Sequence, residues 1–542
     1  MKGWSLSVLA VSLLLFLAGC ASNNHTPPPP AQYTISGTVV DLAAGSGGVA
    51  LQDNGADNLT VTANGNFAFA TKITSGGAYS VTVMTQPASP AQQCSVANGT
   101  GTATANVSNI KVECGHNEWA WMTGAQSVNQ IGAYGTLGTG AATNTPGGRQ
   151  FPATWTDSTG NLWMFGGYGY DSNNNLMPMS DLWEFSAGQW TWMGGPTLTG
   201  QSGNYGSLGV ATTYGIPGAR FQSASWTDAS GNLWLFGGNG FDSVGNESPM
   251  NDLWKYSGGE WTWVGGSSVG KQNGHYGTLG VADASNEPGG RCSMAMWKDS
   301  SGDIWVFGGL GYDATNPANG SLNDLWKYSG GVWTWMGGAT AQGQKGVYGT
   351  KGVAAATNTP GAREAAYNWV DSSGNLWLFG GLGYDSTGTS GYLNDLWKYS
   401  GGQWTWVGGS NVVSQPGVYG TKGTAAANNI PGARWSGVSW VDASGNLWLF
   451  GGTGYYASGS AGFLNDLWEY SGGQWTWVSG ANIAGQNSTY GIEGTLAPGN
   501  TPGSRFFLNG WVDANENFWL FGGYGQVPGA NGNLNDVWMY MP

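Results

Sequence analysis

Short runs of alternating apolar and polar residues, separated by segments rich in Gly, Asn and Asp, fill the chain from residue 33 onward. In the first part they occupy residues 33–40, 59–62, 66–70, 79–83 and 107–112. Alternation with a period of two predicts half-buried β-strands rather than helices. Because the strands are short and closely spaced, we expect residues 33–114 to form a small β-sandwich domain.

From residue 115 onward a single pattern recurs six times. An apolar block that ends in Gly-Gly recurs at intervals of about 71 residues, and repeats of this size indicate stacked or radially arranged units. It begins at Leu162, Leu233, Ile304, Leu376, Leu447 and Phe518. The blocks Asp-Leu/Val-Trp and Trp-Thr/Ala-Trp recur in the same phase. Each unit thus supplies four short strands, and four-stranded units repeated around an axis form a propeller.

The order of these blocks resembles the kelch repeat: an Arg near the start, a strand ending in Gly-Gly, then Asp-Leu/Val-Trp, then paired Trp residues. The resemblance covers residues 115–542 and implies an all-β fold with a six-bladed kelch-type propeller. Residues 33–114 resemble the Ig-like or transthyretin-like β-sandwich modules of bacterial lipoproteins. The repeat region begins with a lone Trp119-Ala-Trp121 block and ends after a third strand. We therefore predict that the first strand completes the last blade, which removes an exposed sheet edge.

Residues 1–20 have the pattern of an export signal, with Lys2 before an apolar stretch too short to span a bilayer. The ending Leu-Ala-Gly-Cys20 resembles the lipobox of bacterial lipoproteins. That resemblance implies a lipid anchor on Cys20 and a place in the cell envelope, with the outer membrane favoured because Ala21 is not Asp. The alternative is an ordinary secretory signal. Residues 21–32 contain four consecutive prolines and predict a stiff linker.

Export bears on the remaining cysteines, because disulfides persist outside the cytoplasm. Cys94 and Cys114 lie in the same small domain, and we expect them to form a disulfide. Cys292 has no such neighbour and is expected to be a small buried hydrophobe in a strand, with a reactive thiol as the alternative.

The formal net charge is −14, with 17 basic and 31 acidic residues, which argues against a nucleic-acid partner. Only three His are present, so no His pair is available to hold copper. The segment that begins at Asp171 lacks the Gly and the Glu of a calcium loop, at Leu176 and Leu182. We therefore predict neither a metal nor another cofactor.

All arginines of the chain occupy one slot, Pro-Gly-x-Arg, once per unit: Arg149, Arg220, Arg291, Arg363, Arg434 and Arg505. In kelch propellers this slot opens the innermost strand near the mouth of the central channel. Two interpretations stay open. The arginines form a cationic ring that binds a carboxylate or an acidic sugar, or each pairs with the Asp of its Asp-Leu/Val-Trp block, which prevents mutual repulsion.

Positions that hold the same residue type in every repeat are expected to stabilise the scaffold. A ligand near the propeller axis is expected to contact positions whose residue types differ between repeats. The residue after each Arg differs strongly: Gln150, Phe221, Cys292, Glu364, Trp435 and Phe506. The loops after Gly-Gly vary too, and four of them carry an Asp: Asp171, Asp242, Asp313 and Asp385. Aromatic rings and carboxylates at one mouth suit glycan or protein binding. The alternative is that the tyrosines of these loops, and of the loops that precede each Arg, only pack against their own loops.

The function that follows is a surface-tethered, non-catalytic binding or scaffold lipoprotein that uses the loop face of its propeller to bind a glycan or a protein. The alternative is a carbohydrate-active enzyme, such as a kelch-type sugar epimerase or a glycosidase, with its site at the channel mouth. This alternative depends on Glu364, the only carboxylate among the residues that directly follow the arginines.

Overall fold

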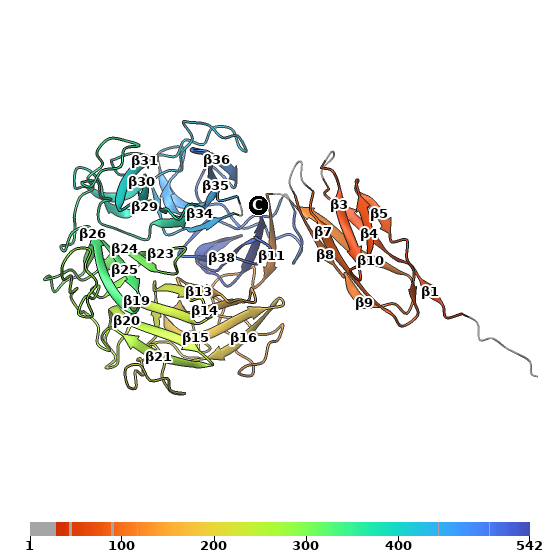
Figure 1. The fold of residues 1–542 in the computed structure, drawn as a ribbon, viewed down its shortest axis with the longest axis horizontal. Helices are drawn as coiled ribbons and strands as arrows, with labels where there is room; N and C mark the ends of the chain where they lie inside the picture. Colours follow the sequence, from red (N-terminus) through yellow and green to blue (C-terminus); the bar gives the residue numbers. More distant parts are fainter. Residues whose placement is uncertain (1–28, 43–45, 88–91, 116, 443, 498) are drawn as a thin grey trace, which may run out of the picture. The chain divides into compact units, whose positions relative to one another are not determined.

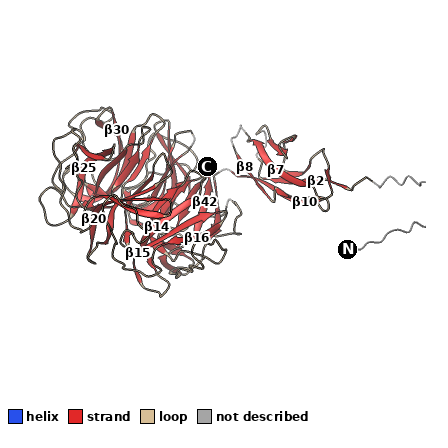
Figure 2. Cartoon of the chain, turned by 60° about the horizontal axis from the view of Figure 1, so that its bottom comes forward, coloured by secondary structure: helices blue, strands red, loops and turns tan. Residues whose placement is uncertain are grey.

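A computed structural model describes residues 29–542 except 43–45, 88–91, 116, 443 and 498. The predicted export signal, Cys20 and most of the linker lie outside the described residues. The chain divides into two compact units, residues 1–114 and 115–542. Strands joined by loops make up both units (Figure 2). Within the described residues, no helix has the length and apolar character needed to cross a membrane.

The first unit contains two four-stranded sheets. One has the order β5 (Gly65–Ala68), β2 (Ile35–Val40), β10 (Val107–Gly115) and β8 (Gln93–Ala97). The other has the order β4 (Asp57–Val61), β3 (Val49–Asp53), β7 (Ala78–Thr85) and β9 (Thr100–Thr102). The short strands β1 (Gln32–Tyr33) and β6 (Ile73–Thr74) pair with each other. Strands β2 and β10 run parallel, and the pairs β2–β5, β3–β4, β3–β7 and β7–β9 are antiparallel.

One hydrophobic core joins these two sheets, with Ile35 and Val112 from one sheet and Leu51 and Val81 from the other. The five expected strands are present, although the first is divided at Thr34. Strands β3, β8 and β9 were not predicted. The residues of β9 are all exposed, and a strand without an apolar face has no alternation to detect.

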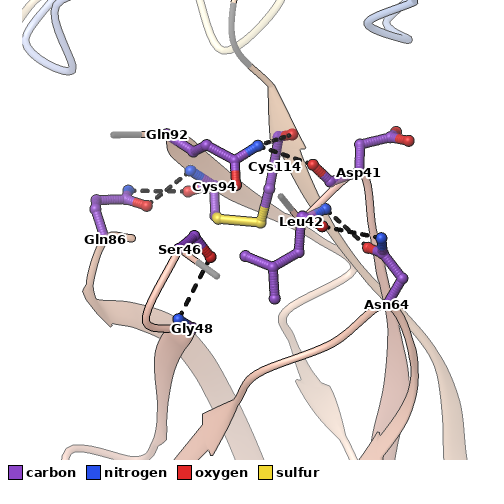
Figure 3. Close-up of a disulfide and its surroundings, with 9 residues drawn as sticks. All are labelled: Asp41, Leu42, Ser46, Gly48, Asn64, Gln86, Gln92, Cys94 and Cys114. Carbon is purple, nitrogen blue, oxygen red and sulfur yellow. Dashed lines mark hydrogen bonds between the residues drawn. A yellow bond between two sulfur atoms is a disulfide. The ribbon is translucent and has the colours of Figure 1, made fainter. Parts of the chain in front are cut away.

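The predicted disulfide between Cys94 on β8 and Cys114 on β10 is confirmed (Figure 3). Beside it, the Gln92 amide donates hydrogen bonds to the carbonyls of Asp41 and Cys114, at 2.8 and 3.3 Å. The bond closes a loop with a sequence separation of 20 residues. By the chain-entropy model such a cross-link stabilises the domain by about 3 kcal/mol.

The second unit repeats a single sheet, whose first copy has the order β12 (Arg149–Gln150), β14 (Leu162–Tyr170), β15 (Leu176–Ser186) and β16 (Gln189–Gly194), with β13 (Ala153–Thr156) also on β14. The second copy contains β17 (Arg220–Phe221), β18 (Ala224–Thr227), β19 (Leu233–Phe241), β20 (Glu247–Ser257) and β21 (Glu260–Gly265). The third contains β22 (Arg291–Cys292), β23 (Ala295–Lys298), β24 (Ile304–Gly311), β25 (Gly320–Ser329) and β26 (Val332–Gly337). The fourth contains β27 (Arg363–Glu364), β28 (Tyr367–Val370), β29 (Leu376–Tyr384), β30 (Ser390–Ser400) and β31 (Gln403–Gly408). The fifth contains β32 (Arg434–Trp435), β33 (Val438–Val441), β34 (Leu447–Tyr455), β35 (Ala461–Ser471) and β36 (Gln474–Ser479).

The sixth repeat is completed by the first strand of the region, as predicted. Strand β11 (Glu118–Thr123) pairs antiparallel with β42 (Val537–Met541), beside β39 (Phe518–Phe521) and β38 (Asn509–Val512). Strands β37 (Arg505–Phe506), β40 (Tyr524–Val527) and β41 (Ala530–Asn533) form the other part of this repeat. The repeated sheets lie around a common centre and form a β-propeller (Figure 1). We number the repeats 1–6 in the order of their arginines.

The expectation of four strands per repeat needs one correction, because the innermost strand is divided into two pieces. At the break in repeat 1, Phe151 has a φ of 48°. Its N–H group donates to the carbonyl of Phe507 at 2.9 Å rather than within its own sheet. The same positive φ and the same type of bond recur at Gln222, Ser293, Ala365, Ser436 and Phe507. Each of the six donates to the preceding repeat, so the hydrogen bonds close into a ring.

Tryptophan side chains fill the space between neighbouring repeats. Trp155 of repeat 1 packs in one core with Leu235 and Trp254 of repeat 2, and its indole N–H donates to the carbonyl of Trp234 at 2.8 Å. Trp183 and Trp254 are fully buried. Large flat rings bury much apolar area with few torsions to fix, which suits a contact that recurs at every junction.

Candidate functional site

The arginines are buried and paired, which is one of the two alternatives left open by the sequence. Arg363 donates from Nη1 to Oδ1 of Asp395 at 2.7 Å and from Nη2 to Oδ2 at 2.8 Å. Its remaining bonds go to the carbonyls of Gly361 and Gly380, at 3.0 and 2.9 Å. Neither charged side chain is more than 1 % exposed. The equivalent pairs are Arg149–Asp181, Arg220–Asp252, Arg291–Asp324, Arg434–Asp466 and Arg505–Asp536.

Two further side chains bind the same carboxylate. The hydroxyl of Tyr348, from the loop between β26 and β27, and the indole N–H of Trp397 donate to Oδ2 of Asp395 at 2.6 and 2.7 Å. Burial alone would lower the pKa of Arg363, but attraction to Asp395 and its hydrogen bonds outweigh this and raise it. Burial, then the charge of Asp395, raises the pKa of Tyr348 far above its usual value. The cluster therefore holds the loop that carries Tyr348 against the sheet, and the charges of Arg363 and Asp395 neutralise each other.

The aspartates of the loops after Gly-Gly are occupied as well. Oδ1 of Asp171 accepts from the backbone N–H groups of Asn173 and Asn175, both at 2.8 Å, and Oδ2 accepts from the N–H of Thr199 at 3.1 Å. Burial raises the pKa of Asp171, but these hydrogen bonds bring it below its usual value. Asp242, Asp313 and Asp385 accept backbone hydrogen bonds in the same way. These carboxylates organise their own loops.

The residues that follow the arginines lie in the first pieces of the innermost strands, and two of them, Trp435 and Phe506, belong to one group of aromatic rings. Trp435 stacks on Tyr392 with ring centroids 6.1 Å apart and meets Phe507 edge-on at 5.4 Å. Phe506 lies 4.1 Å from Phe507 and 4.6 Å from Phe463. We call the group the aromatic crescent: Phe151, Tyr392, Trp435, Tyr455, Phe463, Phe506, Phe507 and Tyr524. All eight side chains are partly exposed.

Repeats 4, 5, 6 and 1 supply the rings of the crescent, and a separate pair of partly exposed rings, Tyr168 and Phe221, belongs to repeats 1 and 2. Glu364 of repeat 4 stands at its end, next in order to Trp435. Burial raises the pKa of Glu364 to about 7. Within the described residues, no group donates a hydrogen bond to its carboxylate. The neighbouring Cys292 is 2 % exposed, and burial, with the charge of Glu364, raises the pKa of its thiol to about 12. Cys292 thus lies buried in a strand, as expected.

The channel also contains a cavity of about 320 Å³ beside the second pieces of the innermost strands. Two of its hydroxyls bond to neighbouring repeats: the Ser225 hydroxyl donates to the carbonyl of Thr154 at 3.0 Å, and the Ser439 hydroxyl donates to the carbonyl of Asn368 at 3.0 Å. The hydroxyls of Ser293 and Ser436, which also line it, have no hydrogen-bond partner among the described residues. No charged side chain lines this cavity. In the described part of the chain, no three His, Cys, Asp or Glu side chains gather in a group able to hold a metal ion.

Sequence reasoning identified Glu364, Trp435 and Phe506 as variable residues at the mouth but missed their aromatic neighbours. Phe151 and Phe507 stand two places after an Arg, a slot that also varies between repeats. Comparing that slot across the six repeats would have found them. Tyr392 and Phe463 come from the third strand, and only the pairing of the strands brings them to the mouth.

No protein-family model matches the chain, and no curated protein sequence matches it either. Among solved structures, the chain is similar to YjhT, with 14% identity over 72% of this chain and 95% of that chain and a TM-score of 0.42. It is similar to a fungal alcohol oxidase of the AA5 family in complex with copper, with 13% identity, coverage of 76% and 77%, and a TM-score of 0.39. A protein of unknown function from Dyadobacter fermentans shares 10% identity, with coverage of 79% and 98% and a TM-score of 0.40. Similarity at this level carries no argument about activity.

Proposed function

We propose that the chain is a lipoprotein of the bacterial cell envelope, anchored through Cys20, whose propeller binds a glycan or a protein without catalysis. In this proposal the second unit is a six-bladed kelch-type propeller. Two sets of contacts support six blades: the ring of hydrogen bonds through Phe151 and its five equivalents, and the pairing of β11 with β42. The first unit, with two sheets around one core, serves as an Ig-like spacer.

The observation that carries the binding proposal is the aromatic crescent. The buried Arg–Asp–Tyr–Trp cluster recurs in every repeat, so it is accounted for by the scaffold. The crescent spans repeats 4, 5, 6 and 1 and leaves its aromatic rings partly exposed. A cluster of aromatic rings that the core does not fully bury is typical of ligand sites.

Carbohydrate-active catalysis remains a second candidate because of Glu364 alone. A carboxyl group with a pKa of about 7 is suited to general acid or base catalysis at neutral pH. Glycosidases, however, generally need a second carboxylate across the substrate. The aspartates of the loops after Gly-Gly, Asp171 and its equivalents, are occupied by backbone hydrogen bonds.

The binding proposal is tested with glycan and peptide arrays on the mature protein and on two variants. Trp435→Ala removes a central ring of the crescent, and we expect at least a tenfold loss of affinity for the retained ligand. Tyr214→Ala is the matched control, because Tyr214 is 63 % exposed in a loop outside the crescent. Absence of any retained ligand at high micromolar concentration, or equal loss in both variants, would contradict the proposal.

The enzymatic candidate is tested separately with a panel of epimerase and glycosidase substrates. If the chain is an enzyme of this kind, the wild type turns over one of them and Glu364→Gln lowers kcat at least a hundredfold. No turnover at all eliminates this candidate and leaves the binding proposal intact. Turnover that survives Glu364→Gln eliminates the role of Glu364 and also contradicts the non-catalytic part of the binding proposal.

A further inference from the structure

Resting on the proposed binding function, we propose that the ligand of the mouth is an uncharged pyranoside, with its apolar ring face on Trp435 and its hydroxyls donating to the Glu364 carboxylate. This narrows the ligand from glycans and proteins in general to neutral sugars. It also makes Glu364 a binding group whose ionisation is coupled to occupancy.

The backbone places the two side chains next to each other around the axis. Ala365 donates its N–H to the carbonyl of Ser293 at 2.8 Å, and Ser436 donates to the carbonyl of Ala365 at 3.0 Å. Glu364 and Trp435 directly precede Ala365 and Ser436, so they stand at adjacent positions on one rim. An aromatic face beside a carboxyl group matches a pyranose, which has a C–H face and a hydroxyl edge.

One polar group of this pair is open to a ligand. The carboxylate of Glu364 is partly exposed and receives no hydrogen bond from any described residue. A polar group that lacks a protein partner gains free energy when a ligand supplies one. Sugar hydroxyls donate hydrogen bonds, so a bound pyranoside supplies that partner. The indole Nε1 of Trp435 is buried and has no hydrogen-bond partner among the described residues, so Trp435 offers its ring rather than its N–H group.

The charge distribution selects against acidic sugars. Each guanidinium near the mouth is held by its own Asp, as Arg363 is by Asp395, so none is available to a ligand carboxylate. An acidic sugar would also meet the negative charge of Glu364 without compensation. A neutral sugar avoids both problems, and the remaining rival is a cationic ligand such as a lysine side chain on the aromatic rings.

Other charges near Glu364 are few. The strands packed against β27 are β24, β25 and β29, and β22 of the preceding repeat carries Arg291 and Cys292. On them, Arg291 and Asp324 pair with each other, and Lys327 pairs with Asp303. Their remaining titratable side chains are Cys292, Tyr328 and Tyr384. Cys292 is the one that interacts with the Glu364 charge.

The sign of the pH effect follows from the donors. Hydroxyls that donate to Glu364 stabilise its ionised form, so binding lowers the pKa of this group from about 7. Affinity therefore rises as the pH rises through 7. A bound-state pKa lower by one unit gives about a tenfold gain between pH 5.5 and pH 8.5.

The test is calorimetric titration of the mature protein with cellotetraose, mannotetraose, galactotetraose and chitotetraose, and with trigalacturonate and trilysine as charged counterparts. We expect a neutral probe to bind about tenfold more tightly at pH 8.5 than at pH 5.5, with less than a twofold change between 0.05 and 0.5 M NaCl. Glu364→Gln flattens the pH profile. The control Glu469→Gln, whose carboxyl pKa is also raised by burial, keeps it.

The outcomes distinguish the neutral-sugar inference from the broader proposal that the propeller binds a glycan or a protein. Binding of trigalacturonate or trilysine alone, or affinity that falls steeply with salt, overturns the neutral-sugar inference while the binding function stands. A neutral probe that binds with a flat pH profile in the wild type overturns the role of Glu364. If no probe binds but the peptide array retains a ligand through Trp435, the inference fails and the proposed function survives.

Discussion

Arg363 and Glu364 are neighbours in the chain and represent two different regions of the molecule. Arg363 belongs to a cluster that recurs in every repeat, is closed to solvent and makes four hydrogen bonds. Glu364 has no counterpart of its own kind, is partly exposed and has no hydrogen-bond donor among the described residues. The difference separates a repeated charge, which is neutralised inside the sheet, from a charge that occurs once and has no hydrogen-bond donor among the described residues.

The junctions between repeats show the same contrast in a milder form. Asn394 of repeat 4 donates to the carbonyl of Pro431 in repeat 5 at 3.4 Å and accepts from the N–H of Ser410 at 3.1 Å. Equivalent bonds are made by Asn251, Asn323, Asn465 and Asn535. In repeat 1 the slot holds Ser180, whose buried hydroxyl has no partner, and Pro196 takes the place of the donor. One junction therefore lacks a contact that the other five share.

The largest effect is expected from breaking the recurring cluster. Asp395→Ala leaves the guanidinium of Arg363 buried without its counter-charge, and we expect a loss of about 3–5 kcal/mol in the free energy of unfolding. Denaturant titration followed by tryptophan fluorescence measures it. Glu364→Gln at pH 5 is the matched control, with an expected change below about 0.5 kcal/mol. A loss below about 1 kcal/mol for Asp395→Ala would remove the distinction between the two regions.

A smaller effect, of opposite sign, is expected from repairing the junction between repeats 1 and 2. In the double variant Ser180→Asn/Pro196→Ser, the first substitution supplies the side-chain amide and the second supplies the backbone N–H group that this amide accepts from. The two added hydrogen bonds stabilise the fold by about 1–2 kcal/mol. Ser180→Asn alone gains less, because Pro196 has no N–H for the new amide oxygen. Thermal unfolding of the single and double variants tests this order, and equal midpoints for both would refute it.

An effect of similar size, confined to neutral and higher pH, concerns the pH dependence of stability. The pKa of Glu364 is raised from 4.5 to about 7 on folding, so the unfolded chain loses this proton more readily. Its contribution to stability is intact below about pH 4.5 and is lost as the pH rises to 7. Glu364→Gln should therefore stabilise the protein at pH 8 by about 1–2 kcal/mol, allowing for partial exposure, and leave it unchanged at pH 4. Denaturation midpoints of the wild type and Glu364→Gln, measured at pH 4 and pH 8, test this prediction. An equal shift of the midpoint at both pH values would show that the ionisation of Glu364 is not the cause.

The sequence was sufficient for the repeat, the strand order and the pairing of Trp119 with the last strand, because these follow from periodic blocks. It left the arginines ambiguous, since a sequence gives the identity of Arg363 but not the direction of its side chain. The split of the innermost strand was missed because Phe151, Gln222 and their equivalents share a positive φ but no residue type. The crescent was seen in part, because half of its rings come from strands brought together only by the fold.

The pairing of β11 with β42 has a consequence for how the propeller forms. The hydroxyl of Tyr540 donates to the side chain of Asn117, 423 residues earlier. A chain made from its N-terminus therefore completes Trp119 long before the partner strand exists. Contacts this distant are slow to form, because a long loop must close first. The ring is thus the last element to assemble, and loss of the final few residues would leave every earlier repeat intact in sequence but the circle open.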